Sequence, residues 1–133
     1  MAEASFGTAI NCIDGRVQEP VAQWMRQTLG VTYVDAITEP GPDKALTQGT
    51  MRQLEGIRDR LAVSLTAHKS VVVAVVGHHD CRGNPVSRER HLELIKKSLE
   101  VVASWGVRVR LLGLWVNEQW AVEVVADTAQ AAR

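Results

Sequence analysis

Two short segments of this 133-residue chain contain the side chains best suited to chemistry, CIDGR at residues 12–16 and GHHDC at residues 77–81. They include both cysteines of the chain, Cys12 and Cys81, and a histidine, His78. Cysteine and histidine are ligands of Zn²⁺ in catalytic sites, where three protein ligands leave a fourth position for water. The two segments therefore predict a zinc site formed by Cys12, His78 and Cys81.

Asp14 and Arg16 lie two residues apart in the first segment. In an extended segment this spacing places both side chains on the same side of the backbone. Arg16 could then bind the Asp14 carboxylate through two hydrogen bonds and hold it ionised. The alternative is a surface salt bridge of little consequence. Because the pair adjoins a predicted metal ligand, an orienting role for Arg16 is favoured.

The composition is that of an ordinary globular protein, with 46% hydrophobic and 23% charged residues and a formal net charge of zero. We expect one domain over residues 1–133. The balanced charge argues against nucleic-acid and membrane partners, and no apolar run has the length of a membrane span. No secretory signal is apparent, so a cytoplasmic location is expected, where two cysteines indicate metal binding or catalysis more than a disulfide.

Strand and helix patterns alternate along the chain. The run VVVAVV at residues 71–76 is apolar at every position, as in a strand buried on both faces of a parallel sheet. Pro40–Asp43 is expected to form a rigid turn without regular structure. The expected strands are Phe6–Cys12, Val31–Ile37, Val71–Val76, Val107–Val116 and Trp120–Val125, and the expected helices are Pro20–Leu29, Thr50–His68 and Ser87–Trp105.

This alternation predicts an α/β fold, an open and mainly parallel sheet with helices on both faces. Ligands of such sheets bind outside the carboxyl ends of the strands, where the strand order reverses. Cys12 closes the first expected strand, and His78 and Cys81 follow the third. If those two strands are neighbours, the three side chains converge in one crevice.

Other histidines and tryptophans have plainer interpretations. We expect His79 to be exposed, although a role as a proton carrier remains open, and Asp80 has no assigned role. His68 and His91 fall at or within helices and are expected to be solvated. Trp115 and Trp120 flank the last turn and could mark a subunit contact.

The paired motifs, C-x-D-x-R after a first strand and G-H-x-x-C after a third, resemble those of the β-class carbonic anhydrases. The resemblance extends from about Phe6 to Val125. It implies strand order 2-1-3-4 with a further antiparallel strand, a homodimer or larger homo-oligomer, and zinc held by Cys12, His78 and Cys81. It also implies that Asp14 and Arg16 are the catalytic dyad, with Asp14 able to become a fourth zinc ligand.

Two segments depart from that family's usual pattern. Thr38–Pro42 (TEPGP) stands where an R-x-A-G-N-like segment is usual, and Arg82–Pro85 (RGNP) follows the second cysteine in place of Gly-Ala. The metal motif is thus intact while the segments of the substrate pocket are altered.

The function implied by the resemblance is hydration of carbon dioxide to bicarbonate, or of a similar small electrophile, by hydroxide formed on the zinc ion. Hydrolysis of carbonyl sulfide or carbon disulfide is an enzymatic alternative. A non-catalytic zinc domain of the same fold is another, and a thiol switch in which Cys12 and Cys81 form a disulfide after metal loss is a third.

Overall fold

The computed structural model describes residues 3–131 and contains a five-stranded sheet. Its strands are β1 (Phe6–Cys12), β2 (Tyr33–Glu39), β3 (Val72–His78), β4 (Arg110–Val116) and β5 (Val122–Asp127). The sheet order is β2-β1-β3-β4-β5, with β1 to β4 parallel and β5 antiparallel to β4. The expected fold class and strand order are therefore confirmed.

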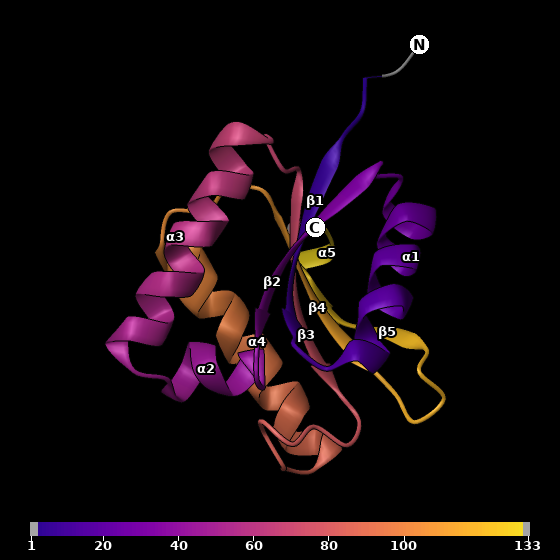
Figure 1. Ribbon diagram of the computed structural model, residues 1–133, viewed down its shortest axis with the longest axis vertical. Helices are drawn as coiled ribbons and strands as arrows, with labels where there is room; N and C mark the ends of the chain where they lie inside the picture. Colours follow the sequence, from indigo (N-terminus) through magenta and orange to yellow (C-terminus); the bar gives the residue numbers. More distant parts are fainter. Residues whose placement is uncertain (1–2, 132–133) are drawn as a thin grey trace.

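Helices cover both faces of this sheet (Figure 1). They are α1 (Gln18–Leu29), α2 (Pro42–Gln48), α3 (Met51–Ala67) and α4 (Arg88–Ser104), with a 3₁₀ turn η1 (Gly15–Val17) before α1 and a short α5 (Thr128–Ala131) at the end. Helix α1 packs on one face, and α2, α3 and α4 pack on the other. Among the described residues, no helix has the length and apolar character needed to cross a membrane.

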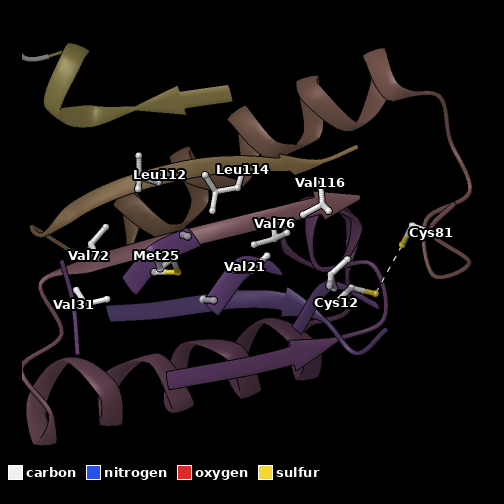
Figure 2. Packing of buried hydrophobic residues seen from close by; sticks show 13 residues of the cluster. Cys12, Val21, Met25, Val31, Val72, Val76, Cys81, Leu112, Leu114 and Val116 are labelled. Carbon is white, nitrogen blue, oxygen red and sulfur yellow. Dashed lines mark hydrogen bonds between the residues drawn. The ribbon is translucent and has the colours of Figure 1, made fainter. Parts of the chain in front are cut away.

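The all-apolar β3 explains why helices are needed on both faces. Alternate side chains of a strand point to opposite faces. Val72, Ala74 and Val76 accordingly pack against α1, whereas Val73 and Val75 face the other helical layer. Figure 2 shows the α1 side of this core, in which Val21 and Met25 of α1 lie over the sheet and Cys12 lies at the end of β1.

The prediction that Pro40–Asp43 excludes regular structure is wrong, because α2 begins at Pro42. Proline is well tolerated in the first turn of a helix, where its missing N–H has no partner to lose. Gly41 precedes it in the left-handed conformation, with φ 59°. The segment is therefore a sharp turn that leads directly into a helix.

The strand order reverses where β1 and β3 end, the position at which ligands bind in sheets of this kind. The chain leaves β1 for β2 on one side and later returns to β3 on the other, so strand order reverses between them. β1 and β3 pair in register only from Thr8 to Ile10. Beyond that point the two strands run on to Cys12 and His78, their last residues. The two segments predicted to form the zinc site, residues 12–16 and 77–81, therefore both begin at this edge.

Candidate metal centre

Three buried side chains meet at the carboxyl edge of the sheet. Cys12 ends β1, His78 ends β3, and Cys81 lies in the loop after β3. One ligand atom from each, the two Sγ atoms and a ring nitrogen, lies within 4.8 Å of the other two. Figure 2 shows the two thiols pointing toward each other.

The spacing of the two sulfur atoms fits a tetrahedral metal ion. Zinc–sulfur bonds of about 2.3 Å at a tetrahedral angle place two sulfurs roughly 3.8 Å apart. The Cys12 and Cys81 sulfurs are 4.0 Å apart. A disulfide would need about 2.05 Å, and both cysteines are free.

His78 is oriented by its own loop. Its Nδ1–H donates a hydrogen bond of 2.7 Å to the carbonyl oxygen of His79, which leaves Nε2 with a free lone pair. That Nε2 atom is buried and has no hydrogen-bond partner among the described residues. A buried polar atom without a partner is rare in proteins, and a metal ion supplies one. The residues present therefore fit zinc.

The two thiols are electrostatically coupled. A hydrogen bond with Cys81 lowers the pKa of Cys12, and the same interaction, together with burial, raises the pKa of Cys81. The backbone N–H of Gly41 faces the Cys12 sulfur and helps to lower the pKa of Cys12, whereas that of Asn84 faces the Cys81 sulfur and partly offsets the rise in the pKa of Cys81. The pair therefore shares one proton, which a bound cation would displace.

The surroundings of the His78 ring act on its pKa in opposite directions. Burial disfavours its cation, but the adjacent Cys12 thiolate and the His79 carbonyl oxygen favour it, and the net effect raises the pKa of His78. A ligand histidine must be neutral, so binding of a metal ion at Nε2 would compete with protonation of that atom.

Asp14 and Arg16 form the ion pair that the sequence predicts, although on a different backbone. Residues 15–17 form a 3₁₀ turn rather than an extended segment, because Asp14 accepts a hydrogen bond from the Arg16 backbone N–H at 2.9 Å. The Arg16 Nη2–Asp14 Oδ2 distance is 2.7 Å, and Nε contacts both carboxylate oxygens. These bonds lower the pKa of Asp14 to about 2 and raise that of Arg16. Asp14 Oδ2 lies 4.0 Å from His78 Nε2.

Trp120 and Asp80 fix the outer side of Arg16. The guanidinium carbon lies 4.6 Å from the centroid of the Trp120 ring, and Nη1 lies 3.3 Å from Asp80 Oδ2. Trp120 has a φ of 60°, which is unusual for a bulky residue and is typical of functional sites. Trp120 lies in the turn between β4 and β5. Asn117 stabilises this turn, since its Oδ1 accepts hydrogen bonds from the backbone N–H groups of Gln119 and Ala121.

The tryptophan predictions have different outcomes. Trp115 is only 3% exposed and packs against His91 inside the chain, so it cannot mark a subunit contact. Trp120 is half-buried, and a contact there stays a prediction. No motif in the sequence indicated its contact with Arg16, because the β4–β5 turn had to be folded before the ring could be placed.

The three histidines other than His78 differ in their exposure to solvent. His79 is exposed, as expected, and so is His68. The expectation that His91 is solvated is wrong, because it is 2% exposed and its Nδ1 lies 2.6 Å from Asp43 Oδ2. The spacing from His91 to Ile95, Leu99 and Val102 already places it on the apolar face of α4, so this signal was available in the sequence.

The two segments that depart from the usual motif pattern lie against each other. A Cβ atom on Gly41 would lie 2.8 Å from both the carbonyl carbon and the oxygen of Gly83. One on Gly83 would lie 2.6 Å from the backbone nitrogen of Gly41. Only glycine permits this approach. It brings the loop after β2 onto the loop that carries Cys81.

We predict that Gly41→Ala destabilises the protein by more than the roughly 1–2 kcal/mol expected for a left-handed backbone alone. The added methyl group meets backbone atoms that cannot rotate away. Gly30→Ala is the matched control, because Gly30 has φ 74° with nothing within 4 Å of the added carbon. Urea unfolding of both variants measures the difference, and equal losses would contradict the close contact.

Three solved structures that share this fold are carbonic anhydrases. β-Carbonic anhydrase isoform I of the protozoan Trichomonas vaginalis superposes with a TM-score of 0.64 at 14% identity, over 96% of this chain and 86% of that one. The carbonic anhydrase of Glaciozyma antarctica gives 0.52 at 14% identity, over 90% and 81%. A tetrameric β-carbonic anhydrase of Sordaria macrospora gives 0.51 at 11% identity, over 95% and 83%. At these identities the likeness shows the fold alone.

No curated protein matches the chain. A family model described as "Putative carbonic anhydrase" matches residues 2–126, nearly the whole sequence. That match includes residues 12–16 and 77–81, the whole of β1 to β4, and β5 except for its last residue. The chain therefore belongs to this carbonic anhydrase-like family.

Proposed function

We propose that this protein is a zinc-dependent lyase that hydrates carbon dioxide to bicarbonate. One observation carries the proposal. The buried His78 Nε2, which has no hydrogen-bond partner in the part of the chain that the structure describes, lies close to the two cysteine sulfurs and 4.0 Å from an ionised carboxylate, Asp14. Three soft or borderline ligands beside an oriented hydrogen-bond acceptor are what hydration of a small electrophile requires.

Cys12, His78 and Cys81 would hold the ion. Zinc bound by three protein ligands lowers the pKa of a coordinated water to near 7 and so supplies a nucleophile at neutral pH. The two thiolates offset the charge of the cation, and the His79 carbonyl keeps the His78 ring in the orientation that presents Nε2.

Asp14 would orient the attacking water. Its Oδ2 lies 4.0 Å from His78 Nε2, and the carboxylate is a strong acceptor with no donor of its own while it is ionised, which Arg16 favours by lowering its pKa to about 2. Arg16 also holds Asp14 in place, since the carboxylate accepts bonds from both the side chain and the backbone of Arg16. This clamp favours Asp14 as an acceptor of hydrogen bonds over Asp14 as a fourth zinc ligand.

Stopped-flow hydration of carbon dioxide by the zinc-loaded protein tests this function. We expect turnover well above the buffer rate. Hydrolysis of carbonyl sulfide, measured in parallel, would move the assignment to that substrate if it were the faster reaction. Stoichiometric zinc with no turnover of either gas would contradict the enzymatic proposal and favour a non-catalytic zinc domain.

We also propose that the protein is a homodimer or larger homo-oligomer in the cytoplasm. Half-buried Trp24 of α1 and Trp120 line an open hollow of about 410 Å³ on the α1 side, a surface suited to a protein contact. One of the structures with this fold is described as tetrameric. Two free cysteines suit a reducing compartment.

The expected assembly mass is at least twice that of one chain at micromolar concentration. Sedimentation equilibrium measures it without reference to shape. Trp24→Glu should shift the equilibrium toward monomer if the hollow lies in the contact, whereas Val63→Glu, on the exposed surface of α3, should not. A wild-type monomer at every accessible concentration would contradict the proposal.

A further inference from the structure

A second set of buried polar groups lies directly behind the candidate metal centre. The Asp43 carboxylate, at the start of α2, is 0% exposed. Its Oδ2 lies 2.6 Å from His91 Nδ1 of α4, and its Oδ1 accepts a hydrogen bond of 3.0 Å from the Asn84 side chain. His91 and Asn84 are each 2% exposed. We call these three residues the Asp43 network.

Asn84 connects the network to the Cys81 loop. Its backbone N–H bonds the Cys81 carbonyl oxygen at 3.3 Å and also faces the Cys81 sulfur. The side chain and the backbone of one residue therefore join the Asp43 carboxylate to the third ligand. Residues 82–86 contain no helix or strand, so these bonds are what holds the loop to the network.

The network also touches the segments that carry the other two ligands. A Cβ atom on Gly77, the residue before His78, would lie 3.3 Å from both Asp43 Oδ2 and His91 Nδ1. Gly41, two residues before Asp43, directs its N–H toward the Cys12 sulfur and packs on Gly83. Asp43 thus contacts the segments that carry His78 and Cys81, and through Gly41 its own segment reaches Cys12.

Stability alone does not account for such a network. Burying a carboxylate and an imidazole costs desolvation free energy, and an apolar trio of similar volume is often as stable or more so. A fully bonded polar network instead selects one arrangement of the groups around it, because each bond has a required length and direction. The arrangement selected here is the position of the loop that contains Gly41, whose N–H faces the Cys12 sulfur, relative to the loop that contains Cys81.

We propose that Asp43, acting through Asn84 and His91, is a positioning residue that fixes the Cys81 loop and thereby sets the affinity of the centre for its metal ion. This inference rests on the proposed zinc site. Removing the group that holds a metal ligand in place typically weakens metal binding by about 10–100-fold. The same loss is expected for Asp43→Asn and for Asn84→Ala.

The experiment is a chelator-competition titration of metal-depleted protein with Zn²⁺ and, separately, with Co²⁺, whose visible spectrum reports its coordination geometry. Asp43→Asn keeps the shape of the side chain but removes the charge that His91 and Asn84 bind. Asn84→Ala cuts only the connection to the loop, so it serves if Asp43→Asn fails to fold. Ser64→Ala is the matched control, since Ser64 is a buried residue of α3 that bonds Asp35 and Thr8 nearer the amino ends of β2 and β1.

We expect both network variants to bind zinc about 10–100-fold more weakly than wild type and to show an altered cobalt spectrum. The Ser64→Ala protein should bind zinc within about twofold of wild type. Its free energy of unfolding should fall by an amount similar to that of the network variants, so that a difference in zinc affinity cannot be attributed to lost stability. Wild-type affinity and an unchanged cobalt spectrum in the folded network variants would overturn the inference alone. Failure of the wild-type protein to bind either ion would overturn the proposed zinc site and the inference together.

Discussion

Cys12→Ser is expected to abolish zinc retention, and Cys81→Ser should do the same. A serine hydroxyl stays neutral at pH 7, so the ion loses an anionic ligand and gains only a weak oxygen donor. The loss of affinity should exceed the roughly 10–100-fold effect of removing a group that merely supports a ligand. Elemental analysis after gel filtration measures the metal that each variant retains.

Ile13→Ser is the matched control for these variants. It introduces the same side chain next to Cys12, at a position that is 64% exposed, and should retain full zinc content. Circular dichroism of the metal-depleted proteins separates lost ligands from lost structure. A folded Cys81→Ser protein with one tightly held zinc would contradict the assignment of Cys81 as a ligand.

The second large effect is expected at Asp14. Asp14→Asn should keep its zinc and lose about 10²–10³ in hydration rate, because an oriented acceptor is replaced by an amide that can donate instead. Arg16→Ala should act in the same direction, since it frees the carboxylate from the bonds that hold it. Asp35→Asn, a half-buried carboxylate in the middle of β2, is the control and should keep wild-type rates.

Steady-state rates and zinc content measured on the same samples distinguish the two roles of Asp14. If Asp14 were a fourth ligand that closes the centre, removing it would open a position, and activity would rise from nothing or stay absent. If it orients water, activity falls with zinc unchanged. A zinc-loaded Asp14→Asn protein with wild-type turnover would contradict both roles.

The architecture could be predicted because its signals are periodic. The apolar run that became β3 and the helical stripe of α3, with Thr50 as its N-cap, each depend on local repeats that the sequence displays directly. The order of the strands followed from a resemblance rather than from periodicity. That order then explains why Cys12 and His78, 66 positions apart, lie close together.

What could not be predicted depends on partners that are distant in the sequence. Asp43 has no local signal of burial, since the side chains that bond its carboxylate, His91 and Asn84, approach from other parts of the chain. The start of α2 at Pro42 was missed because a Pro-Gly-Pro segment is typical of turns, and the same residues also begin helices. The metal-binding and catalytic roles of the site residues themselves stay predictions.

The zinc content of the wild-type protein, purified without added metal and without chelators, tests the central claim most directly. Plasma emission analysis against an amino-acid concentration standard should give about one zinc per chain, because the described residues contain one such ligand trio. A folded protein that contains no zinc and cannot be reloaded with it would contradict the account.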